Sequence, residues 1–297
     1  MVRLIWRTGI ILFLAGFPAA AQPSASELLE AKTLEEIRRF DASFDGALGV
    51  AAIDLESGRA FAYHGDTVFP TASVIKIPIL IRIFQEERNG KFHFSDRITL
   101  RPEDAVGGSG RLQFALKNGP VTLTIQELVT AMIEASDNTA TNQCIAMAGM
   151  ENINRMLDGM GFPQTRLRRR MMDSAAARRG EENVSTPVEM ARLVEAIYRG
   201  KAVDAKASAE ILEIMKKVHG DFQAGLPLDV EVASKTGELP GARCQAGVIL
   251  LTGRPFVLSV MSAFLDDRHT PVPEVTRMVY RYFEKLASSN RYGNRLR

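Results

Sequence analysis

The stretch that decides the fold is Phe69–Glu87, FPTASVIKIPILIRIFQEE, whose apolar part begins at Val74. This run predicts a strongly apolar helix. Ser73 and Lys76 stand at its opening. Their spacing of three residues places both side chains on one helical face, so that the ammonium can approach the hydroxyl. The stretch therefore predicts a core helix that also carries reactive groups.

Such a pair of side chains has a defined chemistry. A serine hydroxyl is a poor nucleophile until a base takes its proton, and a lysine in a dry pocket can have its pKa lowered enough to take or relay that proton. The free backbone N–H groups at the start of a helix suit a developing oxyanion. Because the S-x-x-K pattern often occurs by chance, the pair alone is a weak signal.

Outward from this stretch, we expect strands toward both ends of the chain and helices between them. The expected strands are residues 47–57 and 59–65, around the turn Ser57-Gly58, and residues 230–235, 244–251 and 255–264. The expected helices are residues 26–40, 124–135, 139–149, 151–161, 185–200, 204–220 and 272–289. The clearest start signal is Thr186 as N-cap, followed by Pro187 and Glu189.

This order of elements predicts an α+β fold. The economical arrangement is an antiparallel sheet built from the N- and C-terminal strands and flanked by helices, with an inserted all-helical lobe. We expect a single domain over residues 22–297, with an α/β lobe (22–72 and 220–297) and a helical lobe (73–219). A cleft between the two lobes is the natural place for a site.

The first 21 residues have the composition of a cleaved export signal. Arg3 and Arg7 precede the apolar run TGIILFLAGFPAA, and residues 19–21 offer the small-residue pattern that signal peptidase cuts. The alternative is a membrane anchor, but the run is shorter than the ~20 residues that a span needs. We therefore expect a mature chain from Gln22, periplasmic or secreted, without a stable membrane anchor.

Composition and charge exclude several other classes of function. A net charge of +2 over 297 residues provides no broad field for nucleic acid. No cluster of cysteines and histidines has metal-ligand spacing, so we expect no metal and no cofactor. Cys144 and Cys244 either pair in an oxidising compartment or lie apart as small buried hydrophobes, and both alternatives stay open. Nothing indicates an obligate oligomer, and we expect a monomer.

Two further motifs lie downstream. Ser136-Asp137-Asn138 stands between two expected helices, where it is either a plain N-cap or a source of a proton-transferring hydroxyl and a substrate-binding amide, with Asp137 holding local structure. Lys235-Thr236-Gly237 ends an expected strand, and it is either a strand end with a turn glycine or a sheet edge that binds an anionic group. Taken alone, each motif is more often structural.

The three motifs together resemble one known set. S-x-x-K at Ser73, S-D-N at Ser136 and K-T-G at Lys235 stand in the order and rough spacing of the class A β-lactamases and penicillin-binding proteins. The surrounding segments FPTASVIK, SDNTATN and STPVEMARL also look like class A. The resemblance covers essentially the whole mature chain. It implies a serine acyl-transferase fold and a small-molecule substrate, which is a β-lactam or an acyl-peptide or ester.

The resemblance also implies a role for each matching residue. Ser73 is then the nucleophile, while Lys76 and Ser136 carry protons. The substrate-binding groups are then Asn138 for the acylamide, Lys235 and Thr236 for the carboxylate, the backbone N–H groups of Ser73 and Glu238 as the oxyanion hole, and Arg243 as a second carboxylate partner. For Arg243, a salt bridge or solvent exposure is an equal alternative.

The sequence departs from the class A pattern in one loop. That family deacylates with a glutamate two residues after an arginine, and the arginine forms a salt bridge with a later acidic residue. Counted back from Pro187 without gaps, Arg168 and Asn183 take the bridging positions. Arg170 takes the place of the glutamate, and Ser174 that of the asparagine that follows it.

Asp173 is the nearest carboxylate, and it is the tentative candidate for activating water. A cap or an ion pair with the neighbouring arginines is the stronger expectation for it, and Glu181 and Glu182 lie too near the next helix to be favoured. Asn142 matches a family asparagine that supports this loop, so the loop framework can persist without its base. Positioned acid–base catalysis contributes on the order of 10²–10⁴-fold in rate. Without it, an acyl-enzyme would form normally and be released slowly.

Three functions remain open. The leading one is a secreted hydrolase that opens β-lactam rings through a Ser73 acyl-enzyme and turns over. The second is a penicillin-binding type peptidase, or another serine amidase or esterase. The third is a β-lactam-binding protein that deacylates slowly or has lost activity.

Overall fold

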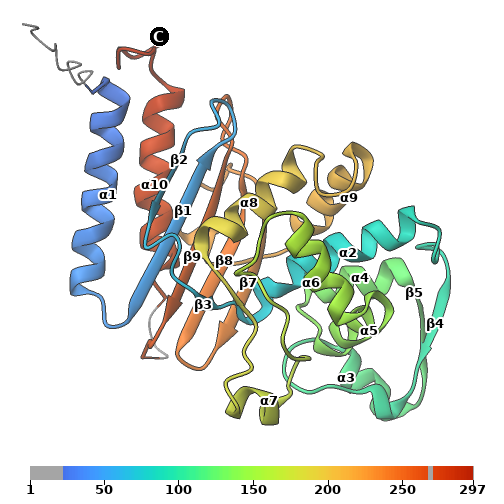
Figure 1. The fold of residues 1–297 in the computed structure, drawn as a ribbon. Coiled ribbons are helices and arrows are strands. Elements are labelled where there is room, and N and C mark those ends of the chain that lie inside the picture. Colours follow the sequence, from blue (N-terminus) through green and yellow to red (C-terminus); the bar gives the residue numbers. More distant parts are fainter. Residues whose placement is uncertain (1–22, 267–269, 297) are drawn as a thin grey trace, which may run out of the picture.

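In the computed structural model, which describes residues 23–266 and 270–296, a five-stranded antiparallel sheet has the order β2-β1-β9-β8-β7 (Figure 1). Its strands are β1 (Ala47–Asp54), β2 (Ala60–Tyr63), β7 (Val232–Leu239), β8 (Ala242–Ile249) and β9 (Phe256–Ala263). β1 pairs with β9 along its whole length, from Ala47 opposite Ala263 to Asp54 opposite Phe256. The predicted α+β fold, with a sheet built from both ends of the chain, is confirmed.

Two long helices cover one face of the sheet, α1 (Ala25–Ser43) and α10 (Val272–Ala287) (Figure 1). α1 begins at a capping box, in which Ser24 Oγ accepts from the Glu27 N–H and the Glu27 carboxylate accepts from the Ser24 N–H. Phe256 of β9 stacks on Phe283 of α10 with ring centroids 4.1 Å apart. This aromatic layer fixes α10 against the sheet.

The opposite face carries α8 (Pro187–Tyr198) and, beyond it, a helical lobe centred on α2 (Lys76–Arg88). The other helices are α3 (Leu112–Ala115), α4 (Ile125–Glu134), α5 (Asn138–Ala148), α6 (Met150–Gly159), α7 (Ser174–Arg178) and α9 (Ala205–Met215). Single 3₁₀ turns are η1 (Ala72–Ile75), η2 (Pro102–Asp104), η3 (Leu116–Asn118) and η4 (Asp221–Gly225). α2 is the core of the lobe, since Ile77, Ile79 and Leu80 are fully buried.

Two short ribbons complete the fold. They pair β3 (Phe69–Pro70) with β6 (Val184–Ser185), and β4 (Arg97–Leu100) with β5 (Val121–Thr124). The β4–β5 ribbon lies inside the range expected to be all-helical. The β3–β6 ribbon joins the segment before Ser73 to the end of the long loop that follows α6, and it therefore ties that loop to the reactive turn.

Among the element boundaries that differ from expectation, two lie at motifs. The α-helix of the opening stretch begins at Lys76, because Ser73 belongs to the tighter turn η1. The strand expected to end at Lys235 continues to Leu239, because β7 stays paired with β8 as far as Leu239 opposite Ala242. The K-T-G motif therefore lies within a strand at the sheet edge.

Cys144 and Cys244 are both buried and free, so the alternative of two separate thiols is the one the structure has. Over the described residues, no helix combines the length and the apolar character needed to cross a bilayer. The predicted export signal of residues 1–21 lies outside the described residues.

Candidate active site

Ser73 lies in η1, where the turn is pressed against strand β7. A Cβ on Gly237 would lie 2.6 Å from the Thr71 carbonyl oxygen and 3.1 Å from the Ser73 nitrogen, so only glycine allows this approach. Ala72, immediately before Ser73, has a φ of 46°, a left-handed conformation that is strained for alanine. Strain of this kind persists where surrounding contacts impose it, and it often accompanies a functional site.

Lys76 is fully buried, and its ammonium points to the S-D-N loop. Nζ donates to the Ser136 carbonyl oxygen at 2.7 Å, to Ser136 Oγ at 3.0 Å and to Asn138 Oδ1 at 3.1 Å. Burial lowers the pKa of Lys76 well below its ordinary value, and the charge of Lys235 lowers it further. Among the described residues, no hydrogen bond joins Lys76 Nζ directly to Ser73. Lys76 is thus a readily deprotonated amine that is coupled to Ser136.

Ser136 Oγ lies between two buried ammonium groups. Lys235 Nζ donates to it at 3.2 Å from the side of the sheet, and Lys76 Nζ donates to it from the helical lobe. Burial lowers the pKa of Lys235 to about 7. Since a hydroxyl oxygen can accept two hydrogen bonds, the Ser136 proton stays free to be donated elsewhere. Ser136 adopts a φ of 51° and is, with Ala72, a second residue of the motifs' surroundings in the strained left-handed region.

The other two residues of the S-D-N motif have different surroundings. Asp137 is buried and accepts from the N–H groups of Leu112 and Ala140, so it caps α5 and holds the preceding loop. Asn138 donates from Nδ2 to the Gly107 carbonyl at 2.9 Å, while its Oδ1 accepts a hydrogen bond from Lys76 Nζ. Asp137 thus has the structural contacts expected of it, and Asn138 is an amide fixed at the cleft wall.

The sheet side of the site is formed by β7, an edge strand whose far side faces η1. Thr236 is partly exposed and Glu238 is exposed. An edge strand leaves backbone N–H groups without a sheet partner, as an oxyanion hole requires. Arg243 forms an ion pair with Glu238 at 2.9 Å and donates to the Leu239 carbonyl, so the salt-bridge alternative holds for this arginine.

These elements enclose a cleft of about 550 Å³. Ser73 and Asn138 lie on one side of it, Glu238 closes it on the sheet side, and residues 171–174 form the opposite wall. Arg169 and Glu182 also line it, and the sequence had not placed either residue there. In the part of the chain that the structure describes, no three His, Cys, Asp or Glu side chains are grouped to hold a metal ion.

The wall opposite Ser73 belongs to the cleft loop, residues 166–183, which is braced from several directions. Asn183 Oδ1 accepts from the N–H groups of Arg168 and Arg169 at 2.8 and 3.0 Å. The Arg169 guanidinium forms an ion pair with Glu182 at 2.7 Å. Asn142 of α5 donates to the Met171 carbonyl and accepts from the Met171 N–H. The loop therefore keeps a defined shape.

The ion pair favours a register one residue away from the one counted from Pro187. That count placed the bridging pair at Arg168 and Asn183, but the guanidinium and carboxylate that meet belong to Arg169 and Glu182, one residue farther inside the loop at each end. The position two residues after the bridging arginine is then Met171. Met171 lines the cleft and is 8% exposed, whereas the Arg170 side chain is exposed and does not line it. In either register, this position carries no carboxylate.

Asp173 serves as a cap. It is the N-cap of α7, and its Oδ1 accepts from the Ala176 N–H at 2.9 Å. The carboxylate also lines the cleft, so the structure brings it to the site with one oxygen engaged. Glu182 was not favoured as the group that activates water, because it is near the next helix in the sequence. It nevertheless lines the cleft, since the β3–β6 ribbon brings the end of the loop back toward η1. No sequence pattern indicated this, since it depends on which strands pair.

Comparison with known proteins identifies the family of this chain. A family model described as the beta-lactamase enzyme family matches residues 32–283. A β-lactamase of Streptomyces albus G is 32% identical over 234 residues, which are 73% of this chain and 72% of that protein. An ancestral class A β-lactamase superposes with a TM-score of 0.77 at 30% identity, covering 84% of this chain and all of that one.

A penicillin-binding protein, PBP-A, is similarly close in structure. It superposes with a TM-score of 0.78 at 28% identity and covers 86% of this chain and 96% of its own. A single-residue variant of PBP-A has been solved as an acyl-enzyme complex with penicillin G. The chain thus belongs to the beta-lactamase enzyme family, as a serine hydrolase of the class A type that shares its fold with penicillin-binding proteins.

Proposed function

We propose that this protein is an exported hydrolase that opens β-lactam rings through an acyl-enzyme on Ser73 and releases the acyl group slowly. The observation that carries the proposal is the contrast across the cleft. A nucleophile near two coupled lysines lies on one side, and Met171, two residues after the arginine of the loop ion pair, lines the other side without a carboxylate. The likeness to both β-lactamases and PBP-A supports the same substrate class.

Acylation uses groups that are already in place. The Ser73 hydroxyl oxygen attacks the β-lactam carbonyl carbon, and its proton passes to neutral Lys76, directly or through a water. The N–H groups of Ser73 and Glu238 stabilise the oxyanion. Lys76 then returns a proton through Ser136 to the ring nitrogen as the C–N bond breaks, which leaves an ester on Ser73. The short contacts among Lys76, Ser136 and Lys235 form the path for this transfer.

Substrate binding is assigned to the groups around this path. Lys235, when protonated, attracts the carboxylate of the β-lactam, and Thr236 can donate a hydrogen bond to it. Asn138 contacts the acylamide side chain. Arg243 is engaged by Glu238, so it would reach the carboxylate only after leaving that ion pair.

Deacylation requires a base that activates water toward the ester. Met171 provides no such base, and Asp173 has one oxygen engaged in a helix cap. The remaining candidates are Lys76 and Glu182. The Glu182 carboxylate receives hydrogen bonds from Arg169 and from the Asn183 N–H, so its Oε1 is already engaged in bracing the loop. Release of the acyl group is therefore the slow step.

A second candidate function is acyl transfer or hydrolysis on a cell-wall type peptide. The likeness to PBP-A favours it, because the acylating groups suit an acyl-D-Ala-D-Ala peptide as well as a β-lactam. The two functions share the nucleophile and differ in the natural acyl donor.

One experiment separates these functions. The protein is incubated with a chromogenic cephalosporin and, separately, with penicillin G, while turnover and intact mass are followed together. We expect a mass increase of one opened β-lactam within the first turnover, followed by slow loss of the adduct. Ser73→Ala should abolish both. Rapid turnover without a detectable adduct would overturn slow deacylation. No adduct together with cleavage of an acyl-D-Ala-D-Ala peptide would establish the second candidate.

Export is part of the same proposal. It rests on the charged, apolar and small-residue order of residues 1–21, which is typical of a cleaved signal. Fractionation of expressing cells with intact-mass analysis tests it, and a periplasmic or secreted species that begins at Gln22 is the expected result. A cytoplasmic species of full length would contradict it.

A further inference from the structure

The start of α1 and the end of α10 lie at the other end of the molecule from α7 of the cleft loop (Figure 1). Residues of these two helix ends, together with Arg254, line a second hollow of about 690 Å³. Five basic side chains and no acidic ones line it. They are Lys32, Arg254, Lys285, Arg291 and Arg295. The catalytic proposal uses none of these residues.

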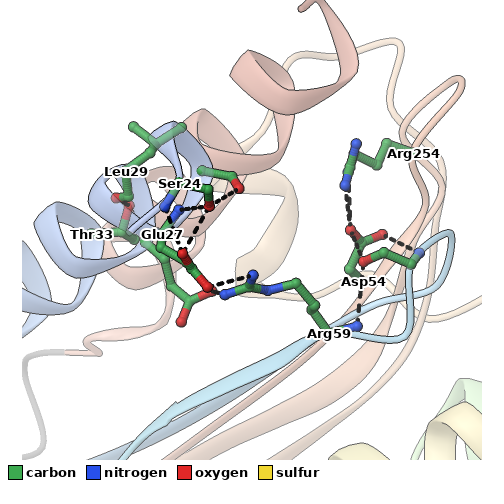
Figure 2. A network of polar contacts seen from close by, with 10 residues as sticks. Ser24, Glu27, Leu29, Thr33, Asp54, Arg59 and Arg254 are labelled. Carbon is green, nitrogen blue, oxygen red and sulfur yellow. Dashed lines mark hydrogen bonds and ion pairs between the residues drawn. The ribbon is translucent and has the colours of Figure 1, made fainter. Parts of the chain in front are cut away.

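The acidic side chains near this hollow already have partners (Figure 2). Asp54 forms an ion pair with Arg254 at 2.6 Å, which neutralises one of the five cations. Glu27 and Glu30 both pair with Arg59, and Glu27 also completes the cap of α1. These three carboxylates are therefore occupied by other groups.

Four cations of the hollow remain without an ionic partner. Over residues 23–266 and 270–296, no salt bridge involves Lys32, Lys285, Arg291 or Arg295, and all four residues are exposed. We call these four residues the basic patch. Four unpaired cations around one hollow create a local positive potential on a chain whose net charge is only +2.

Apolar side chains stand beside the basic patch on an ordered turn. Residues 289–295 fold back on themselves, with Ser289 bridged to Arg295 and the Asn290 N–H donating to the Asn294 carbonyl. This turn presents Tyr292, which is 68% exposed, while the neighbouring Leu296 is 62% exposed. Arg291 stacks over the Tyr292 ring at 4.6 Å. Backbone hydrogen bonds therefore hold an aromatic and an aliphatic side chain in solvent next to cations.

We propose that this face docks on the surface of a bilayer that contains anionic phospholipid. Lysine and arginine side chains near such a surface are attracted by its negative potential, and tyrosine and leucine insert at the level of the headgroups. A soluble polyanion would use the cations but would leave Tyr292 and Leu296 in water. The combination of unpaired cations and exposed apolar side chains therefore favours a membrane surface.

The position of the patch in the chain agrees with this occupant. The apolar segment expected to direct export is joined to Pro23, immediately before the start of α1, at the same end of the molecule. This face thus carries the junction with that segment. Docking by this end leaves the cleft loop, at the far end in Figure 1, open to small substrates.

The test compares two variants in which the net charge changes by the same amount. The protein is purified after export, and its N-terminal residue is determined by intact mass. The patch variant carries Lys285→Glu, Arg291→Glu and Arg295→Glu. The matched control carries Lys117→Glu, Arg178→Glu and Lys206→Glu, three exposed positions in the helical lobe. Circular dichroism and thermal unfolding verify that each variant is folded, independently of any activity toward β-lactams.

Binding is measured by co-sedimentation with vesicles of phosphatidylcholine, with and without phosphatidylglycerol. Each basic side chain near an anionic surface contributes about fivefold in partitioning, so we expect the patch variant to lose at least about tenfold and the control to lose less than about threefold. Tyr292→Ser with Leu296→Ser should weaken binding at high salt as well, where the electrostatic part is screened.

Three results would overturn the proposal. The first is that the unaltered protein does not bind phosphatidylglycerol vesicles. The second is that the patch and control variants lose binding equally. The third is that Tyr292→Ser with Leu296→Ser has no effect on binding. The second result would assign binding to overall charge, and the third would assign it to a general affinity for polyanions. A protein that acylates normally and still fails to bind vesicles would refute this proposal alone.

Discussion

Hydrogen bonds hold both walls of the cleft, but the two walls carry different chemical groups. On the acylating wall, hydrogen bonds between side chains link Lys76, Ser136 and Lys235. The contacts that hold this wall together are therefore the same ones that are proposed to transfer protons. On the loop wall, the side chains of Asn183 and Asn142 form hydrogen bonds with backbone atoms. Those contacts do not depend on the type of side chain at position 171. The loop can therefore keep its shape after losing its reactive group.

This difference explains how a protein of this family can retain one half-reaction and weaken the other. Loss of a residue on the acylating wall would leave buried charges without partners, which is costly. Met171, an apolar residue that lines the cleft, is held through its backbone by Asn142, so the loop contacts do not require a carboxylate there. The five predictions below test this separation, from the largest expected effect to the smallest.

Lys76→Met should remove most acylation, by on the order of 10³–10⁴-fold, because the proton acceptor for Ser73 is lost while the buried volume is kept. The rate of adduct formation with a fluorescent penicillin, read by stopped flow and intact mass, measures this. Lys117→Met, at an exposed position, serves as the control. Acylation within about tenfold of the unaltered protein would mean that another group takes the proton.

Met171→Glu should accelerate deacylation by about 10²–10³-fold, because it places a carboxylate in the cleft on a backbone already fixed by Asn142. Loss of the acyl adduct over time is the measurement. Arg170→Glu is the matched variant one position earlier, and it should have little effect because that side chain lies outside the cleft. A gain in Arg170→Glu alone would restore the register counted from Pro187.

The KM for an anionic β-lactam should rise by up to about tenfold per pH unit above pH 7. Burial lowers the pKa of Lys235 to about 7, so its ammonium is present below that pH and is lost as the pH rises through it. An esterified substrate without the carboxylate is the control, and its KM should stay flat over the same range. Parallel pH profiles for the two substrates would exclude Lys235 as the carboxylate partner.

Arg169→Gln should lower the free energy of unfolding by about 1–3 kcal/mol, because Glu182 is left partly buried without its ion pair. Thermal unfolding measures this. The double variant Arg169→Gln, Glu182→Gln should recover part of the loss, since no unpaired carboxylate then remains. Equal stability of the single variant would show that Asn183 alone fixes the cleft loop.

Asp173→Asn should change deacylation by less than about twofold, because asparagine preserves the N-cap of α7 and no catalytic carboxylate is lost. The lifetime of the acyl adduct, followed by intact mass, is the measurement that tests this. A trapped acyl-enzyme in this variant would identify Asp173 as the group that activates water, and slow release would then have to be explained without an absent base.

The sequence by itself determined the α+β fold, with strands from both ends of the chain around a helical lobe. Hydrophobic periodicity and capping residues such as Thr186 act locally, so the order of elements can be read from neighbouring residues. The motifs at Ser73, Ser136 and Lys235 also identified the three parts of the acylating wall. Their residue types are few enough, and their order fixed enough, to be recognised without coordinates.

Only the tertiary structure decided the loop wall. Whether Arg168 or Arg169 meets a carboxylate depends on how a loop of irregular conformation turns, and no periodic pattern records that. The same holds for the start of α2 at Lys76. The preceding turn η1 lies against Gly237 of β7, and these two segments are far apart in the sequence. Local propensity fixes which elements form. Long-range packing fixes the register at which side chains face each other, and therefore that Met171 faces the cleft.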